Sequence, residues 1–200
     1  MTRKAIIFFI AIGSVFGAVV FLVTATGSLW YLPDTEVPAP ELELGEAQVV
    51  TAKDYPRRLK IPALRIDAGV QEVGVNAKGN MAAPNNFTDV GWYKYGPPPG
   101  FLGSAVITGH VDNALALPGV FKRLRELKIG DDIFVETNDG RELRFRITEI
   151  QRYPYSRVPL NILFARRDLP RLNLITCGGD WLPEERIYDE RLVVYAELVA

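Results

Sequence analysis

The sequence has a single cysteine, Cys177, and a single histidine, His110, among its 200 residues. One cysteine excludes an internal disulfide, and this pair alone excludes a structural zinc site, which needs four ligands of these kinds. The formal net charge is only -1, so the chain lacks the basic excess that nucleic-acid binding requires. Three interpretations of the thiol stay open: an inert buried side chain, a nucleophile or an intermolecular bridge.

Charged residues are also absent from a long stretch near the N-terminus. As a helix rising 1.5 Å per residue, its apolar part, residues 5–23, would reach roughly 28 Å, about one hydrocarbon thickness. Trp30 and Tyr31 follow where such a helix would leave the bilayer, at the usual depth of amphipathic aromatic side chains. We therefore expect residues 5–32 to form a transmembrane anchor.

The charges flanking this stretch indicate its orientation. Arg3 and Lys4 precede it and acidic residues follow it. The positive-inside rule therefore places residues 1–4 in the cytoplasm and the rest of the chain outside the cell membrane. A cleaved signal peptide is the competing interpretation, because Val23-Thr24-Ala25 has the small residues of a cleavage site. Both interpretations export the domain that follows.

The remaining chain divides into a stalk and one globular domain. Residues 33–56 begin rich in proline and acids, a composition that buries little apolar surface, so we expect an extended stalk that holds the domain away from the membrane. Over residues 57–200, short runs alternate between polar and apolar residues, which is typical of β-strands.

The predicted fold of this domain is all-β with short helices. We expect seven to nine short strands, among them residues 58–61, 64–66, 104–108, 132–136, 142–150, 171–176 and 191–199. Asn138-Asp139-Gly140 predicts a hairpin turn between two of them. Helical segments are expected over residues 121–127, 161–167 and, together with turns, 79–88. Many short strands with few helices favour a closed or nearly closed β-barrel.

The lone cysteine and the lone histidine each end a predicted strand. His110 comes directly after Thr108-Gly109, and Cys177 directly after Leu174-Ile175-Thr176. A strand fixes the position of a side chain at its end, and such ends face solvent. Thiolate is the nucleophilic form of cysteine, and an imidazole can take its proton and return it. A packed thiol and a hydrogen-bonded loop histidine would fit the same residues.

Three phrases of the sequence resemble the sortase family. Leu174-Ile175-Thr176-Cys177 is similar to the Thr-Leu-x-Thr-Cys signature, with Asn173 where the leading Thr often stands. Thr108-Gly109-His110 resembles the histidine segment, and residues 191–196 resemble the last strand, which bears an arginine. The phrases GSAVITGHVD and LITCGGD look most like class F sortases. The resemblance covers residues 57–200 and implies a closed eight-stranded β-barrel behind a transmembrane helix.

The resemblance implies an activity and gives roles to residues. A sortase is a membrane-anchored cysteine transpeptidase that cleaves a sorting signal similar to Leu-Pro-x-Thr-Gly between Thr and Gly. Cys177 would form a thioacyl intermediate with the Thr carbonyl, His110 would act as acid and base, and Arg191 would bind the substrate backbone or the oxyanion. Thr176 and Thr108 are expected near the substrate or the oxyanion.

Two parts of the predicted site stay open. Arg186 competes with Arg191 for the role of the cation. The substrate groove should be apolar to receive Leu and Pro, and Leu160 and Ile162 are candidates for its lining, although core packing explains the same residues. The family needs no organic cofactor. Some members bind calcium, but no carboxylate cluster here is specific enough to assign a metal site.

The expected partners follow from the resemblance, and two other functions remain. The partners are secreted proteins with the sorting signal and an amine acceptor, either a cell-wall peptide or a pilin lysine. An L,D-transpeptidase also uses an exported Cys and His, but normally shows Ser-x-Gly-Cys where this chain has Ile-Thr-Cys-Gly. A non-catalytic alternative is an anchored β-barrel that binds a peptide or glycan, with Cys177 buried and inert.

Overall fold

The computed structural model describes residues 49–113, 115 and 117–199. The predicted anchor and residues 33–48 of the predicted stalk lie outside these residues. Within them, none of the helices has the length and apolar character needed to cross a membrane.

Eight strands and several single-turn helices make up the described part of the chain. The strands are β1 (Pro56–Ile61), β2 (Ile66–Val73), β3 (Val90–Tyr93), β4 (Gly103–Thr108), β5 (Asp132–Thr137), β6 (Glu142–Pro154), β7 (Pro170–Leu182) and β8 (Ile187–Leu198). The helices are the 3-10 turns η1 (Ala52–Asp54), η2 (Pro62–Leu64), η3 (Leu124–Glu126) and η4 (Tyr155–Arg157), and the short α-helix α2 (Leu160–Phe164).

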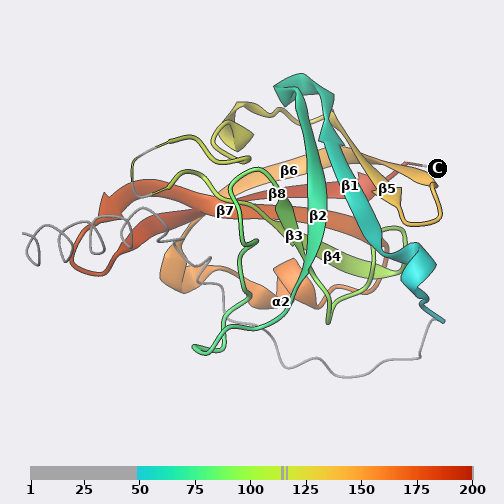
Figure 1. Ribbon diagram of the computed structural model, residues 1–200, viewed down its shortest axis with the longest axis horizontal. Coiled ribbons are helices and arrows are strands. Elements are labelled where there is room, and N and C mark those ends of the chain that lie inside the picture. Colours follow the sequence, from blue (N-terminus) through green and yellow to red (C-terminus); the bar gives the residue numbers. More distant parts are fainter. Residues whose placement is uncertain (1–48, 114, 116, 200) are drawn as a thin grey trace, which may run out of the picture.

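The strands close into a barrel in the order β1-β2-β3-β4-β7-β8-β6-β5 (Figure 1), which confirms the predicted all-β, eight-stranded fold. The pairs β2–β3 and β4–β7 are parallel, and the other neighbours are antiparallel. Between β4 and β7 the chain forms β5, β6 and α2, as a parallel pair requires a long connection. The barrel therefore brings together strand ends that are far apart in sequence.

Apolar side chains fill the barrel and also cover part of its outer surface. The interior cluster draws on all eight strands and includes Trp92, Ile107 and Phe145, each essentially inaccessible to solvent. A second cluster joins Ile175 of β7 to side chains of β4, β8 and α2, among them Phe164. Because successive side chains of a strand point to opposite faces, β4, β7 and β8 are buried on both sides at this wall.

Two predicted helices are wrong. Residues 79–88 form turns and an isolated bridge, in which the Asn86 side chain accepts hydrogen bonds from the backbone N–H groups of Thr88 and Asp89 at 3.0 and 2.8 Å. Such Asx turns compete with helix formation. Residues 121–127 form turns and only η3, because the buried side chains in this segment recur every three residues, the period of a 3-10 helix.

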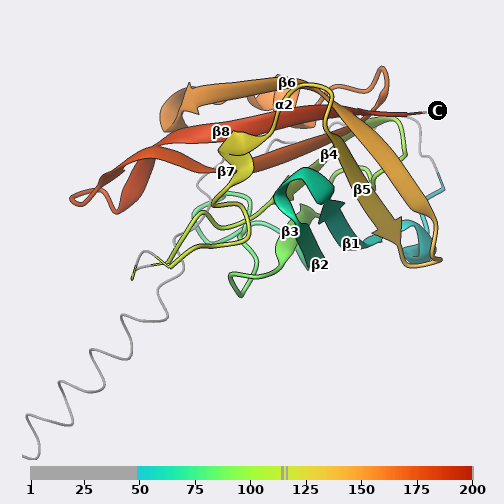
Figure 2. The ribbon, with the colours of Figure 1, turned by 90° about the horizontal axis from the view of Figure 1, so that it is seen from above.

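Two strand features are absent from the sequence prediction. β3 has only four residues, one of them a glycine, and it shows no alternation because all four are buried. The β7–β8 hairpin is also longer than expected, since pairing continues to Leu182 opposite Ile187. Figure 1 and Figure 2 show this hairpin projecting beyond the other strands. The extension carries side chains that border Cys177.

Candidate active site

Cys177 and Arg191 are cross-strand partners on β7 and β8. Residues directly opposite in an antiparallel pair place their Cβ atoms about 4.5–5.5 Å apart on the same face of the sheet. Cys177 is 8% exposed and Arg191 is fully buried. The structure therefore sets the only thiol beside a guanidinium group.

His110 reaches the same place from β4. In the parallel β4–β7 pair, Thr108 lies opposite Ile175, and the Gly109 N–H donates to the Ile175 carbonyl oxygen at 3.3 Å. Extending this register by two residues aligns His110 with Cys177. The three residues singled out from the sequence thus converge at one end of three neighbouring strands.

The imidazole of His110 is nearly enclosed. His110 is 3% exposed, and its Nε2 lies 2.9 Å from the Pro84 carbonyl oxygen. The Phe87 ring packs against it with a centroid separation of 5.1 Å. The loop between β2 and β3 therefore fixes the ring plane from the side away from β4.

Arg191 has buried N–H groups that donate no hydrogen bond. Its Nη1 donates to the carbonyl oxygens of Tyr188 and Glu190 at 2.9 and 2.8 Å, which holds the side chain against its own strand. Its Nε and Nη2 are buried and have no hydrogen-bond partner, and its Cζ lies 6.0 Å from the centre of the Tyr155 ring. Buried N–H groups without a hydrogen-bond partner reduce the stability of the fold. These two are therefore suited to donate hydrogen bonds to a carbonyl oxygen or an oxyanion.

The competing arginine lies elsewhere. Arg186 is in the turn of the β7–β8 hairpin, exposed to solvent and with a φ of 55°. It follows the end of the β7 strand rather than pairing with Cys177. The register therefore favours Arg191 for the predicted role.

The two threonines singled out from the sequence support the strand ends. Thr176 is 1% exposed, and its hydroxyl donates to the Gly109 carbonyl oxygen at 2.7 Å. This hydrogen bond ties β7 to the His110 segment, and Thr176 also lines the pocket beside Cys177. Thr108 is fully buried within β4. Both residues help to position the strand ends, and their role near the substrate or the oxyanion stays a prediction.

A buried carboxylate links the histidine segment to the cysteine hairpin. The Tyr188 hydroxyl donates to Asp112 Oδ1 and Oδ2 at 2.7 and 2.8 Å, and Lys122 Nζ donates to Oδ2 at 2.7 Å. Asp112 is 6% exposed. Burial raises the pKa of Tyr188, and the hydrogen bond to Asp112, the Asp112 charge and Cys177 raise it further. The phenol therefore remains a neutral donor across the physiological pH range.

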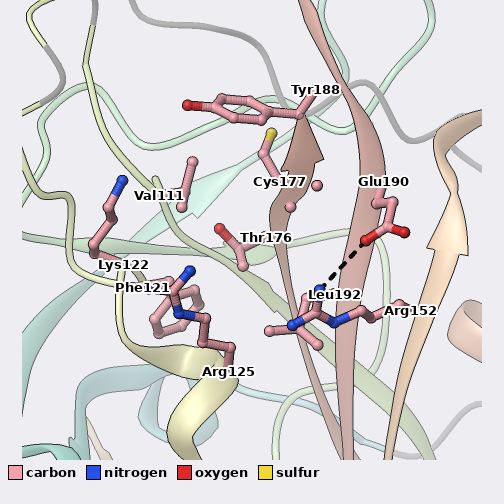
Figure 3. A pocket seen from close by; sticks show the side chains of 12 residues that line it. Val111, Phe121, Lys122, Arg125, Arg152, Thr176, Cys177, Tyr188, Glu190 and Leu192 are labelled. Carbon is pink, nitrogen blue, oxygen red and sulfur yellow. Dashed lines mark ion pairs between the residues drawn. The ribbon is translucent and has the colours of Figure 1, made fainter. Parts of the chain in front are cut away.

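A pocket of about 100 Å³ opens beside the thiol (Figure 3). We call it the Cys177 pocket; its walls are Val111, Phe121, Lys122, Arg125, Arg152, Thr176, Cys177, Gly178, Gly179, Tyr188, Glu190 and Leu192. Figure 3 shows the Tyr188 ring next to the sulfur, with Val111, Lys122 and Arg125 on one side and Glu190 and Arg152 on the other. A small group bound there would meet the thiol directly.

The predicted groove residues lie on α2, outside this pocket. Leu160 is partly buried against the outer apolar cluster, and Ile162 is 39% exposed. Neither side chain borders the Cys177 pocket. Their role in substrate binding stays a prediction.

No metal centre is evident in the part of the chain that the structure describes. No group of three or more His, Cys, Asp or Glu side chains is arranged there to hold a metal ion. The calcium that some sortases bind therefore has no assigned ligands among these residues.

Sequence reasoning did not identify the charged walls of the pocket. Lys122, Arg125 and Glu190 belong to segments with no motif, and Tyr188 belongs to an unpredicted extension of β8. Asp112 lies two residues after His110, and that proximity is the one signal in the sequence that points to it.

Comparisons with known proteins agree with the observed fold. A family model described as the sortase domain matches residues 59–199. Sortase C-1 from Actinomyces oris is similar in structure, with a TM-score of 0.56 and 22% identity, over 72% of this chain and 73% of that chain. The Clostridium perfringens sortase D5 transpeptidase gives a TM-score of 0.54 and 21% identity, over 72% of this chain and 78% of that chain.

Sortase A from Corynebacterium diphtheriae is also similar, with a TM-score of 0.54 and 21% identity, over 73% of this chain and 61% of that chain. No match emerged from the curated proteins. At these identities the solved structures establish the fold alone, and they include sortases of classes C, D and A, so the class F assignment stays a prediction. Because the family model spans well over half of the sequence, the chain belongs to the sortase family.

Proposed function

We propose that the protein cleaves a sorting signal similar to Leu-Pro-x-Thr-Gly between Thr and Gly and transfers the new carboxyl end to an amine. Sortases are cysteine transpeptidases, and the observation that carries the proposal for this chain is the strand register. That register aligns Cys177 with Arg191 on β8 and with His110 after β4. We assign the role of acid and base to His110, which follows β4, that of nucleophile to Cys177 of β7, and that of the cation to Arg191 of β8.

In the first step, the Cys177 thiolate attacks the Thr carbonyl carbon. A C–S bond forms, and the oxyanion that develops is stabilised by the free N–H groups of Arg191. The C–N bond to glycine then breaks, and His110 supplies the proton that the leaving amine needs. The product of this step is a thioester on Cys177.

In the second step, an amine attacks the thioester carbonyl carbon. A new C–N bond forms, the C–S bond breaks, and the proton lost by the amine passes to His110. Near-complete burial of both catalytic side chains limits the access of water, which favours transfer over hydrolysis. The acceptor is a cell-wall peptide or a pilin lysine.

We also propose that Leu160 and Ile162 receive the apolar residues of the sorting signal. Support comes from α2, which contacts β4 and packs on the outer cluster that includes Ile175. Ile162 remains substantially exposed there, as a residue that binds an apolar ligand must be before the ligand arrives.

Membrane anchoring by residues 5–32, with the domain outside the cell, is a further part of the proposal. The uncharged stretch and its flanking charges support it. We expect the full-length chain to stay with membranes after an alkaline carbonate wash and to be digested by protease added to intact cells. A mature chain that begins after Ala25 and is released into the medium would instead establish a cleaved signal peptide.

The central experiment incubates the full chain with peptides of the Leu-Pro-x-Thr-Gly type and a panel of amines. Mass spectrometry should find cleavage after Thr and an amide product with wild type, and a thioester adduct of the peptide. We expect Cys177→Ala to lose cleavage by about 10⁴-fold or more, since it removes the nucleophile. Absence of cleavage that depends on Cys177 would favour the alternative of a binding module with an inert thiol.

A further inference from the structure

The Cys177 pocket carries charges of both signs on facing walls. Lys122 and Arg125 stand on the segment that follows His110, and Glu190 and Arg152 stand on β8 and β6 (Figure 3). A cleft that binds only apolar groups would not require charged side chains on two facing walls. Its charges therefore indicate what kind of molecule approaches the thioester.

The cationic wall has donors available for an anion. Arg125 is exposed and makes no hydrogen bond or ion pair with any residue that the structure describes. Lys122 Nζ uses one of its three N–H groups on Asp112. A guanidinium and an ammonium with free N–H groups form charge-assisted hydrogen bonds with a carboxylate.

The opposite wall has an acceptor available for a cation. Glu190 Oε2 receives no hydrogen bond, but it forms an ion pair with Arg152 Nη1 at 3.6 Å (Figure 3), so one cation already lies beside this carboxylate. Glu190 pairs with Gly178, the residue after the nucleophile. At this separation the ion pair leaves the hydrogen-bonding capacity of Oε2 unused, and an ammonium group entering the pocket would supply a donor to it.

We propose that the Cys177 pocket binds the acceptor, and that the acceptor is an amine with a carboxylate on the same carbon, the head group of an α-amino acid. This inference rests on the proposed transpeptidase function and narrows its acceptor to an amine of the cell-wall peptide with a carboxylate on the same carbon, because the carbon that bears the side-chain amine of a pilin lysine has none. Arg125 and Lys122 hold the carboxylate, and Glu190 holds the ammonium. A pocket of about 100 Å³ has room for such a head group.

The chemistry of transfer fits this placement. The bound ammonium releases one proton to solvent, and the free amine attacks the thioester carbonyl carbon on Cys177. The C–N bond forms, the C–S bond breaks, and the second proton passes to His110. The carboxylate takes no part in the bond changes and serves only to hold the amine in place.

The test compares glycine with glycinamide as acceptors for a Leu-Pro-x-Thr-Gly-type peptide and the full chain. The two differ only in the carboxylate, and glycinamide has the less basic amine, so more of it is free to react at neutral pH. We nevertheless expect glycine to give about ten-fold more transfer product, relative to hydrolysis, as expected for hydrogen bonds to a charged group. Mass spectrometry measures both products.

Arg125→Gln should abolish this preference, measured as the ratio of transfer product to hydrolysis product for each amine. Arg123→Gln is the matched control, because Arg123 is a nearby exposed arginine that pairs with Glu126 and lies outside the pocket. The control should keep the preference. Equal use of both amines by wild type, or a preference that survives in Arg125→Gln, overturns the inference.

A binding measurement separates this inference from the proposed function. In ¹⁵N-labelled Cys177→Ala, glycine should shift the amide signals of Gly178 and Gly179 at lower concentration than glycinamide does. Cleavage and transfer without this difference overturn the acceptor inference and leave the transpeptidase standing. The binding difference without any cleavage by wild type overturns the transpeptidase and leaves an amino-acid site.

Discussion

Charged side chains on the two sides of the barrel have opposite surroundings. On the side formed by β1, β5 and β6 they pair in contact with solvent, as Lys60 does with Glu142 at 3.0 Å and Arg144 with Asp132 at 2.7 Å. On the side formed by β4, β7 and β8, Arg191 is fully buried with two nitrogens that lack partners. Exposed pairs contribute about 0–1 kcal/mol each, whereas a buried cation without full pairing reduces stability.

This contrast shows that the unpaired buried groups, which lower the stability of the fold, lie where the proposed reaction takes place. The solvent-facing pairs are complete without a ligand, so nothing in them calls for one. Two nitrogens of Arg191 and the Oε2 of Glu190 lack hydrogen-bond partners, although Glu190 forms an ion pair with Arg152, and both residues lie beside the single thiol. Unsatisfied buried groups thus mark the working side of the barrel more clearly than charge alone does.

The largest expected effect concerns the buried arginine. Arg191→Gln should lower kcat by about 10²–10³-fold, the usual cost of removing a donor to a developing oxyanion. It should not lower the midpoint of thermal unfolding, because it also removes a buried cation with unpaired N–H groups. Steady-state kinetics and calorimetry measure the two quantities.

The control for this substitution is the competing arginine of the hairpin turn. Arg186→Gln should leave both kcat and the unfolding midpoint close to wild type, since the side chain is exposed. If Arg186→Gln lost activity and Arg191→Gln did not, the assignment of the cation would be reversed.

A smaller effect is expected at the link between the histidine segment and the hairpin. Tyr188→Phe removes the hydroxyl that donates to Asp112, so the His110 segment loses its tie to β8. We expect kcat to fall about ten-fold with an unchanged KM for the peptide, because a small displacement of a catalytic group is costly. The pH dependence of kcat should shift as well.

Tyr195→Phe is the matched control for the lost phenol. The Tyr195 hydroxyl lies in the outer cluster and donates to the Tyr153 hydroxyl at 3.3 Å. The control should lower stability by about 1 kcal/mol, as loss of one hydrogen bond does, without changing the pH profile. Identical pH profiles for wild type and Tyr188→Phe would reduce Tyr188 to a purely structural residue.

A further effect on the working side concerns the exposed apolar residue of α2. Ile162→Ser should raise the KM for the sorting peptide about three- to five-fold, as expected when part of one apolar side chain no longer gains burial on binding. The unfolding midpoint should not change, since Ile162 is 39% exposed. Leu169→Ser, an exposed residue later in the same connection, should leave KM unchanged. An unchanged KM in folded Ile162→Ser would remove α2 from the groove.

The smallest effect is expected on the solvent-facing side. The Thr137 hydroxyl and the Arg141 guanidinium lower the pKa of Asp139 from 3.8 to about 2. A lowered folded-state pKa contributes stability above the unfolded value, and this contribution is lost as the pH falls through about 2. Asp139→Asn should therefore flatten the fall of urea midpoints between pH 3.8 and 2. Parallel curves for the two proteins would contradict this origin of acid sensitivity.

The sequence predicted the elements that carry their own pattern. β4 and β5 are confirmed almost residue for residue, and Asn138-Asp139-Gly140 forms the predicted turn. The meeting of Cys177 and His110 could be inferred only because both end a strand and resemble family phrases. Their alignment depends on the parallel β4–β7 register, which no local pattern specifies.

The sequence failed where tertiary contacts override local preference. The helical spacing of residues 121–127 gave way to η3, because Phe121, Leu124 and Leu127 all pack into the barrel. The β8 extension that carries Tyr188 and Glu190 shows no strong alternation, since its side chains are partly exposed. The acceptor pocket could not be foreseen because its walls come from separate segments.

The parallel pairing of β4 with β7 also affects when the thiol becomes reactive. Contacts between strands so far apart in sequence form slowly, since the ends of a long intervening stretch of chain must first come together. Until they form, neither the His110 imidazole nor the Arg191 guanidinium group lies beside Cys177, which then behaves as an ordinary thiol. The site therefore becomes active only when the barrel closes. The rate at which a thiol reagent labels Cys177 during refolding can report on this last step of folding.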